Sequence, residues 1–343
     1  MNDTPSQVAK RHHTVPKFYL RGFAREDQIA TIRLPGDQRF LQSVNDAAVE
    51  KHFYTVDGHE EGADVVERAL SEVEGRTATI FEKVIAGSWP LDLEDRSALG
   101  YFITLQATRV PALRKTMDYV GAQMLRLQIG AGGKAAFRRQ LEDQGREVND
   151  DLVEDLWAQA TRLEGPPIKQ TNVEHIQHMA ELSEELVKYI IARPWTLIRF
   201  DRRSLVTSDA PVGLIGDPRD EQWQGVGYMT AWGITFPLTR KIGLLMSSID
   251  PLIELKIPVE HVHRGRADAI EAGTTSMEKF LNSYTVANAA ESIFHHPDDE
   301  AFVPEPLPSP EPVTMKMNAP AEFTGEPWFD IPDHDGSRGT TAD

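Results

Sequence analysis

Two adjacent histidines, His12 and His13, lie in residues 10–25 (KRHHTVPKFYLRGFAR), a segment with five cationic residues and no acid. Pro16 suits the first turn of a helix, because its φ is already helical and its missing N–H is not needed there. We therefore expect the helix cap one or two residues before this proline and both histidines beside a helix N-terminus, where the dipole disfavours an imidazolium. A neutral histidine there accepts a proton, or donates a hydrogen bond to a phosphate or a leaving base. The alternative is packing, with one imidazole under the helix and the other at its cap.

A carboxylate at the end of a predicted strand is the second candidate catalytic group. Asp209 follows "SLVT" in the turn "TSDAP". A turn stiffened by proline holds a carboxylate firmly enough to orient a water or to face a developing positive charge. Ser208 beside it is a predicted substrate-binding residue. In the alternative, Ser208 and Asp209 only satisfy backbone donors of their own turn.

Gln106 and Arg109 are predicted to bind the substrate. They are three residues apart on a predicted helix and share one of its faces. A guanidinium matches a phosphate or a carboxylate bidentately. The competing interpretation is a buried salt bridge from Arg109 to Glu72 or Glu74. Three further cations complete the predicted binding set: Lys17, Arg21 and Arg114.

The sequence lacks the residues that several other kinds of active site require. The chain has no cysteine, so disulfides, thiolate zinc sites and a cysteine nucleophile are excluded. The histidines of residues 175–178 and 261–263 supply no three ligands at a recognisable spacing, and "GAGG" is not followed by the Lys-Ser/Thr of a phosphate loop. We predict no cofactor and no metal, although a metal held by distant residues, such as His12 or His13 with Asp209, stays open.

The elements that must position these groups are mostly helical. Apolar residues recur at helical spacing, and short apolar runs bounded by Asp, Gly and Pro predict strands. Predicted helices cover 61–85, 93–110, 112–129, 135–144, 150–162, 173–191 and 266–290. Predicted strands are "QIATIRL" paired with "KHFYTV", then "WTLIRF", "SLVTS", "WGITFPL" and "IGLLMSS". This order predicts an α+β fold, a predominantly α-helical single domain with a small, mainly antiparallel sheet.

Charge and proline divide the chain unevenly. Residues 297–343 hold nine of the 22 prolines and eleven acids against two cations, which predicts a disordered acidic tail after one globular domain over 1–296. The net charge of −17 argues against nucleic acid as a partner, but the tail supplies −9 of it. No apolar segment of signal-peptide or membrane-spanning type is present, so we expect a cytoplasmic protein with no membrane contact.

Five stretches, in order, resemble the bacterial family of unknown function DUF4238: "HHTVPKFYLRGF", "LQATRVPALR", "TSDAPVGL", "ITFPLT" and "FLNSYTVANA". The resemblance covers about residues 12–294. It implies a mostly helical single domain, often encoded near mobile or antiviral gene clusters, and no particular reaction. The motif positions here are His12, His13, Pro16, Leu20, Arg21, Phe23, Gln106, Arg109, Pro111, Ser208, Asp209, Pro211 and Pro237.

Histidines, one rigid carboxylate and arginines suit hydrolysis through an oxocarbenium-like transition state. The leading hypothesis is metal-independent N-glycosidic cleavage of a modified nucleobase in DNA, in the defence setting that the resemblance implies. Asp209 would stabilise the sugar cation while His12 or His13 assists the departing base. The alternatives are a phosphodiesterase or nuclease using His and Asp with or without a metal, and a non-catalytic module that binds nucleic acid or protein. The expected partner is DNA or a nucleotide, and the sequence leaves the oligomeric state open.

Overall fold

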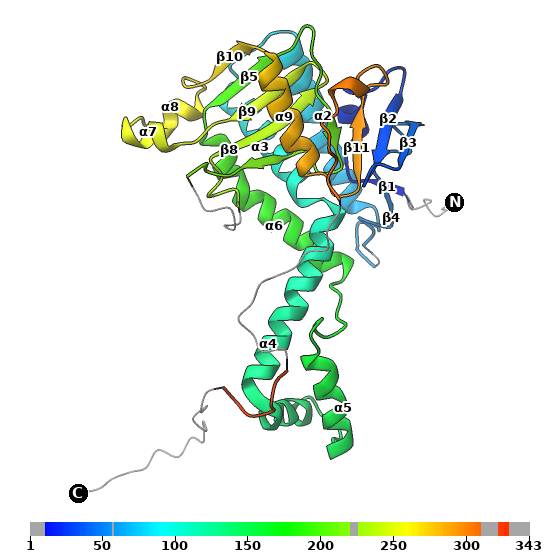
Figure 1. The fold of residues 1–343 in the computed structure, drawn as a ribbon. Coiled ribbons are helices and arrows are strands. Elements are labelled where there is room, and N and C mark those ends of the chain that lie inside the picture. The colour runs from blue at the N-terminus through cyan, green and yellow to red at the C-terminus, as the bar shows by residue number, and fades with distance from the viewer. Residues whose placement is uncertain (1–10, 57, 220–225, 310–321, 329–343) are drawn as a thin grey trace, which may run out of the picture. The chain divides into compact units, whose positions relative to one another are not determined.

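The computed structural model describes residues 11–56, 58–219, 226–309 and 322–328 (Figure 1). Its first half carries β1 (Arg11–His13), α1 (Lys17–Arg21), β2 (Gln28–Arg33), β3 (Gln38–Ser43), β4 (Val49–Lys51), α2 (Val65–Ile85), α3 (Leu93–Thr108), α4 (Pro111–Asp143), α5 (Asp150–Thr161) and α6 (Asn172–Ile191). The second half carries β5 (Trp195–Arg199), β6 (Thr207–Ser208), β7 (Gly213–Ile215), β8 (Gly233–Thr239), β9 (Ile242–Met246), α7 (Asp250–Glu254), α8 (Val259–His263), β10 (Ala269–Ala272), α9 (Thr275–Ala287), β11 (Ser292–His295) and η1 (Glu300–Phe302).

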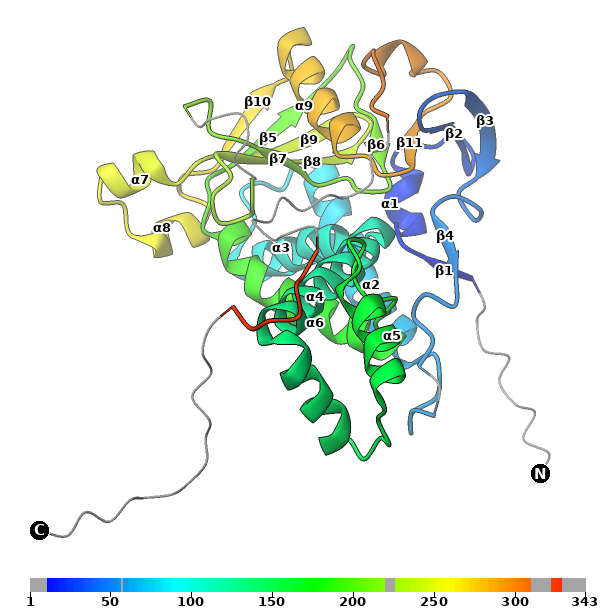
Figure 2. The same cartoon turned by 60° about the horizontal axis from the view of Figure 1, so that its bottom comes forward.

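A five-stranded sheet in the order β10-β5-β9-β8-β7 forms the centre of the main core. Only the β10–β5 pair is parallel, and the other pairs are antiparallel. In β8, Phe236 packs with its ring centroid 5.3 Å from that of Tyr19 in α1, and both belong to one cluster with Phe102 of α3. On the other face, Gly213 of β7 lies against Tyr284 of α9. Because helices cover both faces, β8 is buried along almost its whole length (Figures 1 and 2).

Two smaller antiparallel sheets hold the N-terminal motif and the "TSDAP" turn. β1 pairs with β4, and a four-stranded sheet has the order β3-β2-β11-β6. The predicted pairing of "QIATIRL" with "KHFYTV" is wrong, because β2 pairs with β3 and β11 instead. β3 is not predicted from the sequence, because its residues are mostly polar and exposed and its two apolar residues, Phe40 and Leu41, are adjacent and show no alternation. The α+β class with mainly antiparallel sheets is confirmed.

The chain divides into two compact units, residues 1–113 with 171–311 and residues 114–170 with 312–343. The expected division into one domain over 1–296 and a tail stays a prediction. The second unit has a core of its own. That core consists of Phe137, Leu141, Val153, Trp157 and Ala160. The break expected at "GAGG" is present, because Gly133 interrupts α4 with a φ of +77°. An added Cβ at Gly133 would lie 2.7 Å from the Pro327 nitrogen, which requires glycine there.

Part of the expected acidic tail packs within the folded units. In the first unit, Asp299 and Val303 are buried. In the second unit, the Phe323 ring stacks on the Trp328 ring, and the backbone N–H of Trp328 donates to the Ala131 carbonyl. Residues 310–321 and 329–343 of the expected tail lie outside the described residues.

Within the described part of the chain, no helix combines the length and apolar character that crossing a membrane requires.

Candidate functional site

A cavity of about 570 Å³ lies beside the histidine pair in the first unit. The segment from β1 to α1 forms one wall and α2 forms another. The lining residues are Arg11, His13, Lys17, Phe18, Asn45, Tyr54, Glu67, Leu70, Ser71, Glu74, Gly75 and Ala78. The α2 members Glu67, Ser71, Glu74 and Ala78 recur at helical spacing, so one face of α2 presents two carboxylates and a hydroxyl to the cavity.

The histidines belong to a short strand, which corrects the predicted helix cap. Pro16 itself is the N-cap of α1, with extended ψ and no side-chain cap bond, and α1 has only five residues. His12 is 1% exposed, and its Nδ1 accepts a hydrogen bond of 2.8 Å from the Tyr54 N–H. Its Nε2 lies 3.5 Å from Oε2 of Glu67. His12 is therefore a buried, oriented group in contact with Glu67, which lines the cavity.

His13 faces the cavity directly. Burial and the neighbouring Lys17 lower its pKa to about 4, although hydrogen bonds with the backbone of Val44 and Asn45 act in the opposite direction. The imidazole is therefore neutral at pH 7. Its Nε2 is buried and has no hydrogen-bond partner among the described residues. A neutral imidazole nitrogen without a partner can accept a proton from a group that reaches it, and a small movement of the ring would expose it to the cavity.

Arg109 lies behind the cavity, where its guanidinium holds a lining carboxylate. Its Nη1 donates to Oε1 of Glu74 at 2.9 Å, which is the salt bridge that the sequence offered as the competing interpretation. Arg109 is only 2% exposed and its Nε and Nη2 have no partner among the described residues. Gln106, 1% exposed, likewise lacks partners for both side-chain amide atoms there. Buried polar groups in folded proteins are nearly always satisfied. Three motif residues thus carry unsatisfied atoms: His13, Gln106 and Arg109.

Asp209 lies at a different, smaller cavity of about 90 Å³. Its carboxylate accepts backbone N–H bonds from Ala290 (2.9 Å), Glu291 (2.7 Å) and Ser292 (3.1 Å). Burial raises its pKa to about 6, and these three hydrogen bonds limit the rise. Thr14 lines this cavity, whereas His13 lines the larger one. Neither of these two cavities is lined by both Asp209 and a histidine of the pair.

The remaining predicted site residues take several positions. Lys17 lines the larger cavity. Arg21 forms an exposed ion pair with Asp27, at 2.8 Å. Ser208 is buried, and its Oγ accepts the Ala210 N–H at 3.2 Å, as in the local turn proposed as the alternative. Arg114 belongs to the second unit and is not among the residues that line the cavity.

Groups of acidic and histidine side chains suited to a metal ion are absent from the residues that the structure describes. Two carboxylates, one neutral imidazole and two cations line the larger cavity together with the aromatic rings of Phe18 and Tyr54.

Tyr54, Glu67 and Ser71 line the cavity but are not among the site residues predicted from the sequence. The helical spacing of residues 67, 71, 74 and 78 within the predicted helix 61–85 is the signal that could identify Glu67 and Ser71. Placing Tyr54 required knowledge that its N–H donates to His12, a contact across 42 residues.

The fold and cavity define an α+β protein with a histidine and two glutamates at one pocket. The family model described as "Protein of unknown function (DUF4238)" matches residues 11–299. The chain therefore belongs to the DUF4238 family, in agreement with the motif resemblance. No curated protein and no solved structure matches the chain.

Proposed function

We propose that the larger cavity is the active site of a hydrolase that removes a nucleobase from DNA by N-glycosidic cleavage, without a metal. The observation that carries this proposal is the neutral His13, whose unpartnered Nε2 shares one cavity with the Glu67 carboxylate. Phe18 and Tyr54 provide aromatic walls on which an extruded base can stack. Lys17 and Arg11 supply positive charge for the phosphates that flank the base.

In this proposal Glu67 takes the role that the sequence analysis gave to Asp209. Asp209 already accepts three backbone N–H bonds, whereas Glu67 is partly exposed at the cavity and lies next to His12. A carboxylate in that position stabilises the oxocarbenium-like sugar. Water adds to C1′, its proton passes to Nε2 of His13, and the electrons of the broken C–N bond leave with the base. The base takes up the proton that His13 gained.

Phosphodiester cleavage is the second candidate, and the position of Lys17 next to His13 favours it. Lys17 lowers the pKa of His13, which places the cation close to the imidazole. A phosphate bound by Lys17 would bring a scissile P–O bond to the same base. For either reaction, the proposed antiviral setting rests on the family resemblance alone. We also propose that the protein is located in the cytoplasm.

The test is incubation of the full chain with modified and unmodified DNA in EDTA, followed by treatment with alkali. Strand breaks that appear only after alkali show abasic sites and support base removal. Breaks before alkali indicate a nuclease, and intact DNA with a mobility shift indicates a binding module.

Glu67→Gln should lower kcat by about 10²–10⁴-fold with DNA binding retained, because the carboxylate acts on the transition state. Glu72→Gln is the matched control, since Glu72 is an exposed glutamate of the same helix outside the cavity lining. Equal activity in the wild type and Glu67→Gln would remove Glu67 from the mechanism.

A further inference from the structure

Cations gather at a second cavity of about 540 Å³, at the turn between β8 and β9. Arg199, Arg240 and Lys241 line it together with Thr239, and Asp201 is the one acid among its lining residues in the described structure. This cavity shares no lining residue with the first one. The cationic excess is the feature that requires explanation, because the chain as a whole is strongly acidic.

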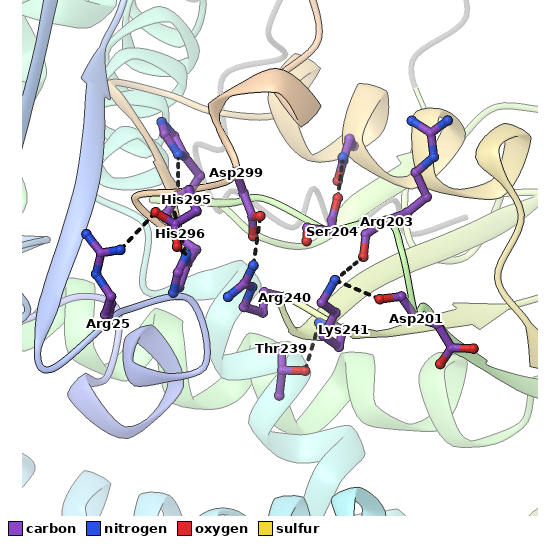
Figure 3. A network of polar contacts seen from close by, with 12 residues as sticks. Arg25, Asp201, Arg203, Ser204, Thr239, Arg240, Lys241, His295, His296 and Asp299 are labelled. Atoms are coloured by element: carbon purple, nitrogen blue, oxygen red, sulfur yellow. Dashed lines mark hydrogen bonds and ion pairs between the residues drawn. The ribbon is translucent and has the colours of Figure 1, made fainter.

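Lys241 has a donor left for a ligand. Its ammonium donates to the backbone carbonyls of Arg203 (2.7 Å) and Asp201 (3.3 Å), as Figure 3 shows. An ammonium has three N–H donors, so one remains. Burial and the adjacent Arg240 lower the pKa of Lys241, although Asp299 and Asp201 act in the opposite direction.

Arg240 and Thr239 add two further donors on the same turn. Nη2 of Arg240 donates to Oδ1 of Asp299 at 2.8 Å, whereas its buried Nε has no partner among the described residues. The Thr239 hydroxyl oxygen accepts the Lys241 N–H at 3.1 Å, so its own O–H is available to donate. Three consecutive residues that line the cavity thus each have an N–H or O–H group without an acceptor among the described residues, and the Arg240 Nε–H needs a small side-chain movement to reach a ligand.

We propose that this cavity binds a phosphate group, held by the Lys241 ammonium, the Arg240 Nε–H and the Thr239 hydroxyl. A phosphate accepts several hydrogen bonds and offsets the repulsion between neighbouring cations, and charge-assisted bonds of this kind are the strong ones. Arg199 adds long-range attraction, while its guanidinium also donates to the Val84 and Ile85 carbonyls at the end of α2. This inference is independent of the hydrolase proposal.

The phosphate could be free or part of a nucleic-acid strand. Gly22, which follows α1, lines this cavity, and Lys17 at the other end of α1 lines the first. The two cavities therefore lie at opposite ends of one five-residue helix. A strand that places a base in the first cavity would have a neighbouring phosphate available for the second.

Isothermal titration calorimetry of inorganic phosphate into the full chain at low salt tests the site. Lys241→Gln should weaken binding at least tenfold, and Thr239→Val should weaken it several-fold while Lys241 stays in place. Arg202→Gln is the matched control, because Arg202 is exposed on the adjacent turn and is not among the lining residues. Circular dichroism checks that each variant folds. If Lys241→Gln fails to fold, the phosphate affinity of Thr239→Val alone tests the site.

Undetectable phosphate binding by the wild type, or equal weakening by Arg202→Gln, overturns the inference. Loss of binding in Lys17→Gln but not in Lys241→Gln or Thr239→Val would also overturn it and leave the hydrolase proposal standing. Competition by a DNA dodecamer without terminal phosphates assigns the phosphate to a strand. Absence of competition assigns it to a small ligand.

Discussion

Protonation of His13 should make an identifiable contribution to acid destabilisation. In the folded chain its pKa is lowered to about 4, from 6.5 in an unfolded chain. Between these two values the unfolded state binds more protons than the native state does. The free energy of unfolding therefore falls as pH decreases from 6.5 toward 4, and the contribution is fully present above 6.5.

The magnitude follows from the shift. A difference of about 2.5 pKa units corresponds to roughly 3 kcal/mol, and solvent screening of a partly buried group reduces this to about 2 kcal/mol. Replacement by a group that does not titrate, His13→Asn, should remove this contribution. Other buried histidines with lowered pKa, His295 and His296, are shared by both proteins and cancel in the difference.

The assay is urea unfolding of wild type and His13→Asn, followed by circular dichroism at pH 7.5, 5.5 and 4.5. The stability difference between the two proteins should change by about 2 kcal/mol across this range, with the wild type losing more on acidification. The raised pKa of Asp209 has the opposite effect, because it increases the free energy of unfolding on acidification. Asp209 is present in both proteins, so its effect cancels in the difference. Parallel stability curves over the whole range would refute the description of His13 as a buried neutral base.

Four further predictions concern stability and are measured by denaturant unfolding at pH 7.5. Asp268→Asn should cost about 3–5 kcal/mol, because it leaves the fully buried Arg96 guanidinium without its carboxylate partner. Asp209→Asn should cost about 1–3 kcal/mol, since an amide cannot accept all three N–H bonds. Tyr19→Phe should cost about 1–2 kcal/mol through loss of the 2.7 Å bonds that its hydroxyl makes in the core. Gly133→Ala should cost about 1–3 kcal/mol, because its positive φ and close backbone neighbours exclude a Cβ. A change below 0.5 kcal/mol in any of these variants would contradict the interaction assigned to that residue.

Helices were the predictable part of this fold, because their signal is local. The predicted helix 93–110 appears as α3 (Leu93–Thr108), and 173–191 appears as α6 (Asn172–Ile191). Both have Asp or Thr caps that accept a backbone N–H three residues later, Asp92 and Thr171. The late strands were also predictable, since burial on both faces gives continuous apolar runs.

Strand pairing and the division into two units were not predictable in the same way. β2 takes β11 as a partner from more than 250 residues away, and nothing in either strand specifies the other. The second unit has a small core between α4 and α5, and its hydrophobic pattern resembles that of the main core. Periodicity shows that a helix buries one face, but it does not show which core receives that face.

The candidate site illustrates the same limit at the level of single residues. The structure places His13 at the cavity wall, whereas its neighbour His12 faces the other way along the strand and is buried against Tyr54. Alternation along a strand separates adjacent residues, so a pair of histidines on β1 cannot share one environment. On a helix cap both could have approached one ligand. Because β1 places only His13 at the cavity wall, a second group had to come from another element, and α2 supplies Glu67 with His12 behind it. The roles of the two histidines should therefore separate in experiment, with His13 affecting proton transfer and His12 affecting the position of Glu67.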